Sequence, residues 1–240
     1  MENYSAMIFE QRKFFFKTIR IILDDEVLKR TLQARSHSYI TGLSYNNFPA
    51  GSEVHIKSKK TTVIELGDDY FKRFNDTTRN EIRRTEKVSD LSFQIPDTNR
   101  DAVYRLYRAF ESEGNRIVRP AAYFHRSVFF GAYLGGELMA AILCYDAYPY
   151  MRAHAIVSSL LENSLHRKWK SFVLRRLVFE ICNYGKERDY LWFDLGGVNL
   201  SDEEKAGITA FKLGFGGRMI SEYTYTYKSP FLRFLKILNF

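Results

Sequence analysis

Two short motifs bring together the residue types that acyl transfer requires. Asp194, Gly196 and Gly197 end an apolar segment with the pattern of a strand, and Lys212 precedes a second glycine cluster. Glycine permits positive φ and a close approach of a ligand to the main chain. Acyl transfer to an amine needs an unprotonated amine and a charge that stabilises the developing oxyanion. We therefore predict that Asp194 deprotonates or orients the amine. Lys212 is predicted to stabilise the oxyanion, together with the backbone near Gly196 and Gly197.

The same two side chains also have structural interpretations. An aspartate at this position can cap the following loop, and a lysine near the end of a helix interacts with the helix dipole. No Ser-His-Asp or Cys-His pattern for a covalent nucleophile stands out in the sequence. We therefore expect direct attack of the amine on the donor, without a metal.

Other candidate residues lie in separate segments. His154 and Ser158 are four residues apart in a predicted strand, so both side chains are expected on one face of the sheet. His154 is a second candidate base, with a structural histidine as the alternative. Tyr123, Phe124 and Phe211 are predicted to contact substrate, with core packing as the alternative.

Two basic segments are candidate phosphate sites. One is a helix predicted from Thr78 to about Lys87, and the other is the helix start at Ser164–Ser171, where backbone N–H groups add to the basic side chains. The predicted substrate contacts in the first segment are Arg79, Asn80, Arg83 and Arg84. The predicted contacts with a coenzyme A pyrophosphate in the second are Arg167, Lys168, Lys170 and Ser171. A solvated basic helix face is the alternative in both.

The elements that position these residues alternate between strand and helix patterns. We predict a helical and irregular stretch over residues 1–52 and a catalytic domain over residues 53–240. The domain is expected to contain strands at Val54–Ile56, Thr61–Leu66 and Leu91–Ile95, a helix from Val103 to Phe110, a Gly135-Gly136 hairpin, a strand at Met151–Ser159, a helix from Trp169 to Gly185, a strand at Tyr190–Phe193, a helix opening at Ser201 and a strand at Met219–Tyr227. This order predicts an α+β fold around a central mixed sheet flanked by helices.

Composition and charge indicate the kind of binding partner and the cellular compartment. The 240 residues are 45% hydrophobic and 27% charged, with a net charge of +8 that favours anionic partners. Cys144 and Cys182 lie in apolar segments and are predicted to be buried thiols in a reducing compartment. The absence of a signal-peptide pattern and of a membrane-spanning apolar run predicts a cytoplasmic location. The basic aromatic segments Arg12–Ile22 and Phe231–Leu238 are expected either to dock on the domain or to contact an anionic membrane as amphipathic helices.

The paired glycine motifs resemble those of the Fem-type peptidyltransferases, which form peptidoglycan bridges. These enzymes carry an aromatic-Asp-x-Gly-Gly strand end, as at Phe193–Gly197, and Phe-Lys-x-Gly-Phe-Gly before an aromatic strand, as at Phe211–Gly216. The resemblance covers residues 60–228 and implies the fold of the GNAT acyltransferases. It also implies that Lys212 stabilises the transition state and that the Arg79–Lys87 helix lies near the substrate cleft.

The chain departs from that family in two respects. Fem-type enzymes have two such domains, often with a helical arm, and take amino acids from aminoacyl-tRNA, whereas this length predicts one full catalytic domain. The chain also lacks the Arg/Gln-x-x-Gly-x-Gly/Ala loop with which GNAT enzymes hold coenzyme A.

We predict an N-acyltransferase that moves an acyl group from acyl-CoA to the amine of a dTDP- or UDP-linked amino sugar, for surface polysaccharide synthesis. The alternative activity is aminoacyl-tRNA-dependent transfer to a peptidoglycan precursor or a protein. The alternative outside enzymes is a non-catalytic basic module that binds nucleic acid. The oligomeric state stays open.

Overall fold

The computed structural model describes residues 7–13, 15–159, 164–201 and 206–237, with the backbone alone at residues 13, 164–168 and 235–237. The chain forms two compact units. Unit 1 contains Met1–Thr61 and Met219–Phe240, and unit 2 contains Thr62–Arg218. Strands β4 (Val54–Glu65) and β10 (Arg218–Lys228) contribute residues to both. The predicted division at residue 52 assigns the C-terminal residues to the catalytic domain. In the structure these residues group instead with the N-terminal ones.

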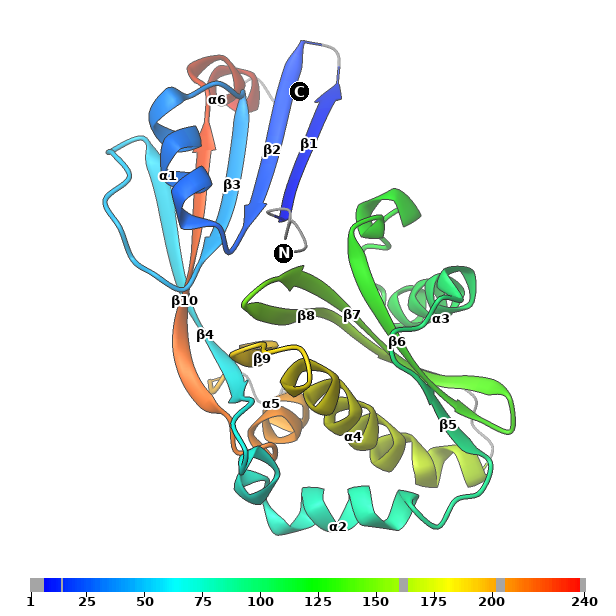
Figure 1. The fold of residues 1–240 in the computed structure, drawn as a ribbon. Coiled ribbons are helices and arrows are strands. Elements are labelled where there is room, and N and C mark those ends of the chain that lie inside the picture. Colours follow the sequence, from blue (N-terminus) through cyan, green and yellow to red (C-terminus); the bar gives the residue numbers. More distant parts are fainter. Residues whose placement is uncertain (1–6, 14, 160–163, 202–205, 238–240) are drawn as a thin grey trace. The chain divides into compact units, whose positions relative to one another are not determined.

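Unit 1 is a mixed sheet with strand order β1-β2-β3-β10-β4 (Figure 1). The remaining elements are β1 (Met7–Lys13), β2 (Phe16–Ile22), β3 (Tyr39–Ser44), α1 (Asp25–Ala34) and α6 (Pro230–Ile237). Asp24 caps α1 by accepting a hydrogen bond from the Val27 N–H at 3.0 Å. Leu28 and Leu32 of α1 pack against Ile21 and Tyr225 of the sheet.

The prediction of a helical stretch at the N-terminus is wrong for most of its length. Residues Met7–Lys13 and Phe16–Ile22 form an antiparallel hairpin. In β2 the buried residues Ile19 and Ile21 alternate with the partly exposed Thr18 and Arg20, which is the two-residue period of a strand. Among the described residues up to 52, the helix is α1.

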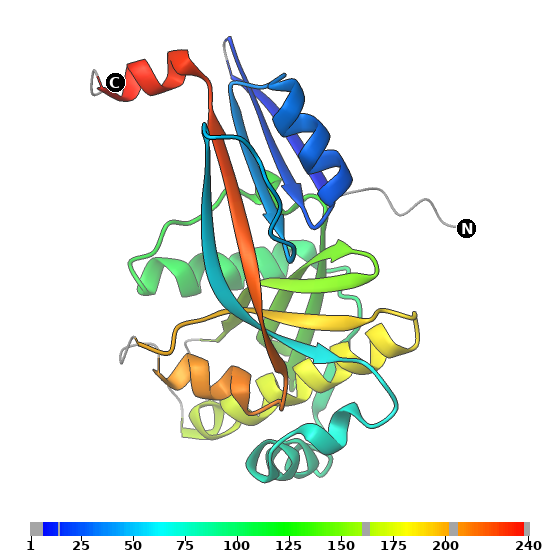
Figure 2. The same cartoon turned by 90° about the vertical axis from the view of Figure 1, so that its left-hand side faces the viewer.

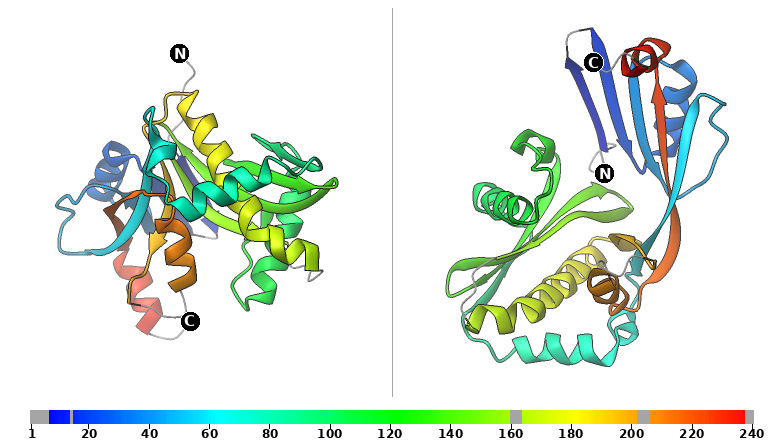
Figure 3. Two further views of the ribbon diagram at one scale, coloured as in Figure 1. Left: turned by 90° about the horizontal axis from the view of Figure 1, so that it is seen from below. Right: turned by 180° about the vertical axis from the view of Figure 1, so that it is seen from behind.

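Unit 2 has strand order β4-β9-β8-β7-β6-β5, with helices on both faces of the sheet (Figure 3). Its strands are β5 (Leu91–Gln94), β6 (Ser127–Leu134), β7 (Glu137–Ala147), β8 (Tyr150–Ser158) and β9 (Trp192–Val198). Its helices are α2 (Asp76–Thr85), α3 (Arg100–Glu113), α4 (Ser164–Lys186) and α5 (Ala206–Leu213), with 3-10 turns η1 (Tyr70–Arg73) and η2 (Ala121–Phe124). Strands β5 to β8 are antiparallel neighbours, and β8 and β9 are parallel.

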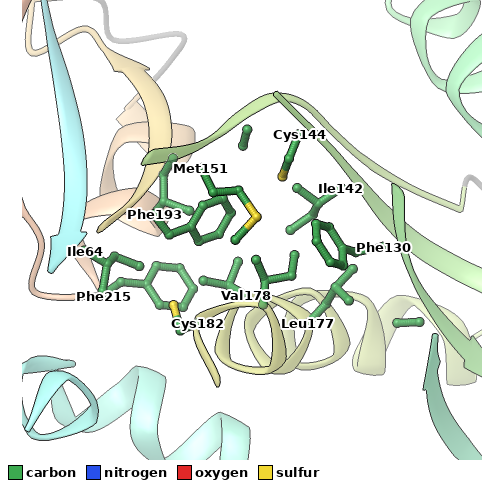
Figure 4. Packing of buried hydrophobic residues seen from close by; sticks show 14 of the residues in the cluster. Ile64, Phe130, Ile142, Cys144, Met151, Leu177, Val178, Cys182, Phe193 and Phe215 are labelled. Carbon is green, nitrogen blue, oxygen red and sulfur yellow. The ribbon is translucent and has the colours of Figure 1, made fainter. Parts of the chain in front are cut away.

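The main core of unit 2 lies between the sheet and α4 (Figure 4). Phe130, Ile142 and Phe193 from the strands meet Leu177 and Val178 from the helix. The two cysteines, Cys144 of β7 and Cys182 of α4, are also fully buried here, as predicted. Burial raises the pKa of both thiols, because a thiolate is poorly solvated in an apolar environment.

The predicted strand and helix order of unit 2 is confirmed, but several boundaries differ, of which three bear on the site or its neighbours. The two strands predicted around a turn at Lys57–Lys60 are the single strand β4, where the Lys60 Nζ donates to the Ser221 Oγ of β10 at 3.0 Å. Helix α2 begins earlier than its predicted start at Thr78, because Asn75 provides the cap by accepting from the Thr78 N–H at 2.8 Å. Strand β9 continues beyond Asp194 through both glycines to Val198. The predicted helix start at Ser201 is followed directly by residues 202–205, which lie outside the described ones.

Gly216, in the second glycine cluster, has a backbone conformation and a close neighbour that only glycine accommodates. Its φ is +60°, and a Cβ there would lie 1.8 Å from the carbonyl oxygen of Arg73. We expect Gly216→Ala to destabilise the fold by about 2 kcal/mol or more and to lower Tm by roughly 4–8 °C in thermal denaturation. Gly67→Ala is the matched control, since Gly67 has open space around its Cα and no positive φ. Equal Tm values for the two variants would contradict this account.

Candidate functional site

The Asp194 carboxylate is buried at the middle of β9, with 0% of the residue exposed. One of its oxygens accepts a hydrogen bond from the backbone N–H of Gly196 at 2.7 Å. The other accepts from the guanidinium of Arg152 on β8 in an ion pair. Asp194 therefore fixes the turn of backbone at Gly196, where φ is +81°, and neutralises a buried cation.

Arg152 is the buried partner of Asp194 that the sequence interpretation missed. It is 8% exposed in a strand whose neighbours Met151 and Ala153 are also buried. A charged residue inside such an apolar strand requires a partner of opposite charge. A charged residue in an apolar strand was therefore the sequence signal for a buried ion pair. The parallel register, which sets Arg152 opposite Asp194, identifies the partner.

Lys212 lies at the same point of the sheet. From the last turn of α5 its Nζ donates a hydrogen bond to the carbonyl oxygen of Gly197 at 2.7 Å, and the residue is 9% exposed. A Cβ on Gly196 would lie 3.6 Å from this Nζ and 3.3 Å from the carbonyl oxygen of Ala153. The structure thus brings the predicted pair, Asp194 and Lys212, to opposite ends of the same two-glycine segment.

Phenylalanine packing anchors the segment that contains Lys212. Phe215 is fully buried, and its ring meets Phe74 at 5.1 Å and Phe211 at 5.2 Å between centroids, both edge to face. The carbonyl oxygen of Gly214 accepts from the N–H of Asn75, the residue that caps α2, at 2.9 Å. Phe211 is partly buried beneath the guanidinium of Arg175. The second motif therefore joins α5 to the start of α2.

Strands β8 and β9 stop pairing at this site. Their parallel register covers three described positions, from Tyr150 opposite Trp192 to Arg152 opposite Asp194, although both strands continue. A β-bulge lies in the pairing of β8 with β7 at the same level, between Leu143 and Cys144. Bulges re-aim strands next to functional sites. The backbone beyond the last pair is where an extended ligand can add to a strand edge.

The bulge overturns the expected relation of His154 to Ser158. His154 is the residue skipped in the register, so the side-chain alternation shifts by one position beyond it. His154 lies between the rings of Phe124 and Tyr145, on the face that packs against α3. Ile156 packs in the cluster on the α4 side of the sheet. Ser158 is two residues further along the strand and therefore lies on that same face. Ser158 is also buried, so the two residues do not form one polar face.

His154 is the centre of a small aromatic cluster. Its ring stacks on Tyr145 at 4.1 Å and on Phe124 at 5.3 Å, each with 15° between planes, and its Nε2 lies 2.9 Å from the Ser127 Oγ. Tyr123 meets the histidine ring edge to face at 6.4 Å. These contacts support the structural alternative for His154 and Phe124. The assignment of His154 as a base stays a prediction.

The predicted basic helix is α2, but its arginines have different surroundings. Arg79 donates to the carbonyl oxygens of Lys72 and Phe74 at 2.5 and 2.7 Å and pairs with Asp76, so its guanidinium holds η1 against α2. Arg83 and Arg84 are exposed and lie near the rings of Phe71 and Phe172. Asn80 is exposed as well. The geometry favours Arg83 and Arg84 over Arg79 for an anionic ligand.

The second basic segment belongs to α4. Lys170 and Ser171 lie in the helix, at least six residues after its first described residue, Ser164, and the Ser171 Oγ accepts from Arg175. The side chains of Arg167 and Lys168 are outside the described ones. The pyrophosphate site at these four residues stays a prediction. Among the described residues, no three His, Cys, Asp or Glu side chains gather where they could hold a metal ion.

The strands, helices and site geometry define a GNAT-like α+β fold, which confirms the predicted fold class. No protein-family profile matches the sequence, and no curated protein matches it. The solved structure of FemX is similar with a TM-score of 0.66 and 12% identity, over 95% of this chain and 86% of that one.

Two further structures are similar over the same span. The C-terminal domain of a protein assigned as a lysylphosphatidylglycerol synthetase, from Agrobacterium fabrum, has a TM-score of 0.56 and 14% identity over 96% of this chain and 83% of that one. L-PGS from Bacillus licheniformis has a TM-score of 0.54 and 15% identity over 96% and 83%. At these identities the likeness establishes the fold. The predicted resemblance to Fem-type proteins is supported at that level. Within the described ranges, no helix is long and apolar enough to cross a membrane.

Proposed function

We propose that this chain transfers an aminoacyl group from aminoacyl-tRNA to an amine, at the Gly196–Gly197 segment of β9. The observation that carries the proposal is the position of Lys212, whose Nζ is held 2.7 Å from the Gly197 carbonyl oxygen. An ammonium fixed beside two glycines can donate to a carbonyl oxygen as negative charge develops on it. The amine attacks the ester carbonyl directly, the ester bond breaks, and the tRNA hydroxyl leaves with a proton.

Asp194 acts in this proposal as a positioning residue. Its two oxygens bind the Gly196 N–H and the Arg152 guanidinium, so the carboxylate holds the shape of the glycine segment against which the substrate lies. The first prediction, that Asp194 acts on the amine itself, requires this carboxylate to reach the amine from a fully buried position. The burial favours the positioning role.

The choice of donor rests on the span of the structural likeness. The expectation of an acyl-CoA donor relied on the length of the chain, which was judged to hold a single catalytic domain and so to be too short for a bridge-forming enzyme that uses aminoacyl-tRNA. The likeness to FemX extends over 95% of this chain and 86% of the FemX chain, so that argument from length loses its support. The resemblance to Fem-type enzymes implies an aminoacyl-tRNA donor, and the name lysylphosphatidylglycerol synthetase likewise describes an aminoacyl product.

A second candidate is transfer from acyl-CoA to the amine of a dTDP- or UDP-linked amino sugar. The end of pairing between β8 and β9 favours it, because the amide-containing arm of coenzyme A can pair with an open strand edge. In this candidate, the exposed Arg83 and Arg84 of α2 contact the nucleotide phosphates.

One assay separates the two. The protein is incubated with labelled aminoacyl-tRNA and, separately, with acyl-CoAs plus dTDP- or UDP-amino sugars. Transfer of label that is abolished by prior RNase treatment supports the first candidate, and thiol release that depends on the amino sugar supports the second. No transfer from either donor across a broad acceptor panel would contradict acyl transfer. Salt-sensitive RNA binding unchanged in Lys212→Ala would then favour a non-catalytic binding module.

A further inference from the structure

One end of the unit 1 sheet collects aromatic side chains from distant parts of the sequence. Lys13 pairs with Phe16 at the tip of the β1–β2 hairpin, Thr18 pairs with Tyr39, and Tyr39 pairs with Lys228. The hairpin tip, the start of β3 and the end of β10 therefore lie together. Helix α6 follows β10 directly and lies at this same end (Figures 1 and 2).

Among the residues that the structure describes at this end, three phenylalanines are exposed. Phe15 is 89% exposed at the hairpin tip, and Phe231 and Phe234 of α6 are 59% and 58% exposed. The ring of Phe16 stacks on Phe231 with 5.9 Å between centroids, which joins the hairpin to the helix. We refer to Phe15, Phe231 and Phe234 as the phenylalanine cluster. Exposed aromatic groups of this kind mark a surface for apolar contact.

Helix α6 is held so that these rings stay outward. Phe231 and Phe234 are three residues apart and share one face of the helix. On another face, Arg233 donates to the carbonyl oxygens of Lys228 and Glu53, each at 2.9 Å. A helix anchored by its arginine and exposing two phenylalanines is amphipathic, as in helices that lie in a membrane interface. The expectation of an amphipathic helix is met at α6, whereas the described residues of Arg12–Ile22 belong to the β1–β2 hairpin.

The charges around the cluster are mainly positive. Arg12 and Lys17 are exposed on the hairpin, and Lys228 lies at the end of β10. Of the carboxylates nearby, Glu53 forms an ion pair with Arg35 at 2.9 Å, and Glu10 is hydrogen-bonded to the His37 Nε2 at 3.0 Å. This surplus complements an anionic surface.

We propose that the phenylalanine cluster docks unit 1 on a membrane that contains anionic phospholipids. The rings enter the boundary between headgroups and acyl chains, while Arg12, Lys17 and Lys228 contact lipid phosphates. Phenylalanine has no hydrogen-bonding group, so the cluster is better suited to lipid than to reading a nucleic acid. The proposal does not depend on the proposed function, since all these residues lie outside the Lys212 site.

Vesicle flotation tests it with the full chain. The protein is expected to float with vesicles of phosphatidylcholine containing about a third phosphatidylglycerol, and far less with phosphatidylcholine alone. Phe231→Ser with Phe234→Ser is expected to weaken binding about tenfold or more. Arg12→Glu with Lys17→Glu is expected to weaken it at least tenfold, an effect that added salt mimics.

Matched variants identify the surface. Ile117→Ser removes a side chain that is 75% exposed in unit 2, and Lys57→Glu with Lys59→Glu reverses exposed charges on β4; both are expected to bind vesicles as the parent does. Lys212→Ala is also expected to bind normally, which separates docking from lipid bound at the transfer site. No vesicle binding by the parent, or equal losses in the control variants, would overturn the proposal. So would phenylalanine-dependent self-association or RNA binding without vesicle binding.

Discussion

Lys212→Ala is expected to lower turnover about a hundredfold while leaving the fold intact. The loss corresponds to about 3 kcal/mol of transition-state stabilisation, the usual effect of removing one oxyanion donor. The ground-state contact it removes, between Nζ and the Gly197 carbonyl oxygen, is a single hydrogen bond. We therefore expect kcat to fall more than KM rises, because the interaction that matters is made in the transition state.

The matched control for Lys212 is Lys186. Both lysines lie in the last turn of a helix, and Lys186 forms an exposed ion pair with Asp68 at 2.9 Å. If Lys212 acted only through the helix dipole, Lys212→Ala and Lys186→Ala would have similar, small effects on Tm and none on turnover. Steady-state kinetics and thermal denaturation of the two variants make the comparison. Equal turnover in both would remove Lys212 from the mechanism.

Local sequence signals were sufficient for most of unit 2. The Gly135-Gly136 turn and its flanking apolar runs specify the β6–β7 hairpin, and the repeat of Val173, Leu177 and Ile181 specifies the buried face of α4. The proximity of Asp194 to Lys212 was predictable because the two glycine motifs that contain them occur as a pair in the Fem-type family. The hairpin and the helix face are each specified by residues close together in the sequence, so local patterns were enough to predict them.

Features set by tertiary contacts were not predictable in the same way. The shift of side chains at His154 follows from one bulge in the β7–β8 pairing, which the alternation of the sequence does not reveal. The N-terminal hairpin was mistaken for a helix because Phe14–Ile22 combines apolar and basic residues in an order compatible with either period. The capping role of Arg79 depends on carbonyl groups of η1 that approach only in the fold.

Asp194→Asn is expected to lower both stability and turnover, through Arg152. The asparagine can still accept from the Gly196 N–H, so the substitution removes mainly the negative charge that neutralises Arg152. An unpaired buried guanidinium costs about 3–5 kcal/mol, which lowers Tm by roughly 6–20 °C for a chain of this size. Turnover is expected to fall about a hundredfold as the unpaired Arg152 guanidinium disturbs the adjoining glycine segment.

Combining Asp194→Asn with Arg152→Met separates positioning from direct chemistry. The double variant has no unpaired charge, so thermal denaturation should show most of the lost stability restored, with a coupling energy of about 2 kcal/mol or more. If Asp194 acts by holding the Gly196 backbone, kcat recovers along with stability, because the asparagine keeps that contact. A stable double variant with turnover still a hundredfold low would instead show that the carboxylate acts on the amine itself. The pH profile provides a second reading: a carboxylate base produces an acidic limb in kcat that Asp194→Asn abolishes, whereas a positioning carboxylate leaves the shape of the profile unchanged.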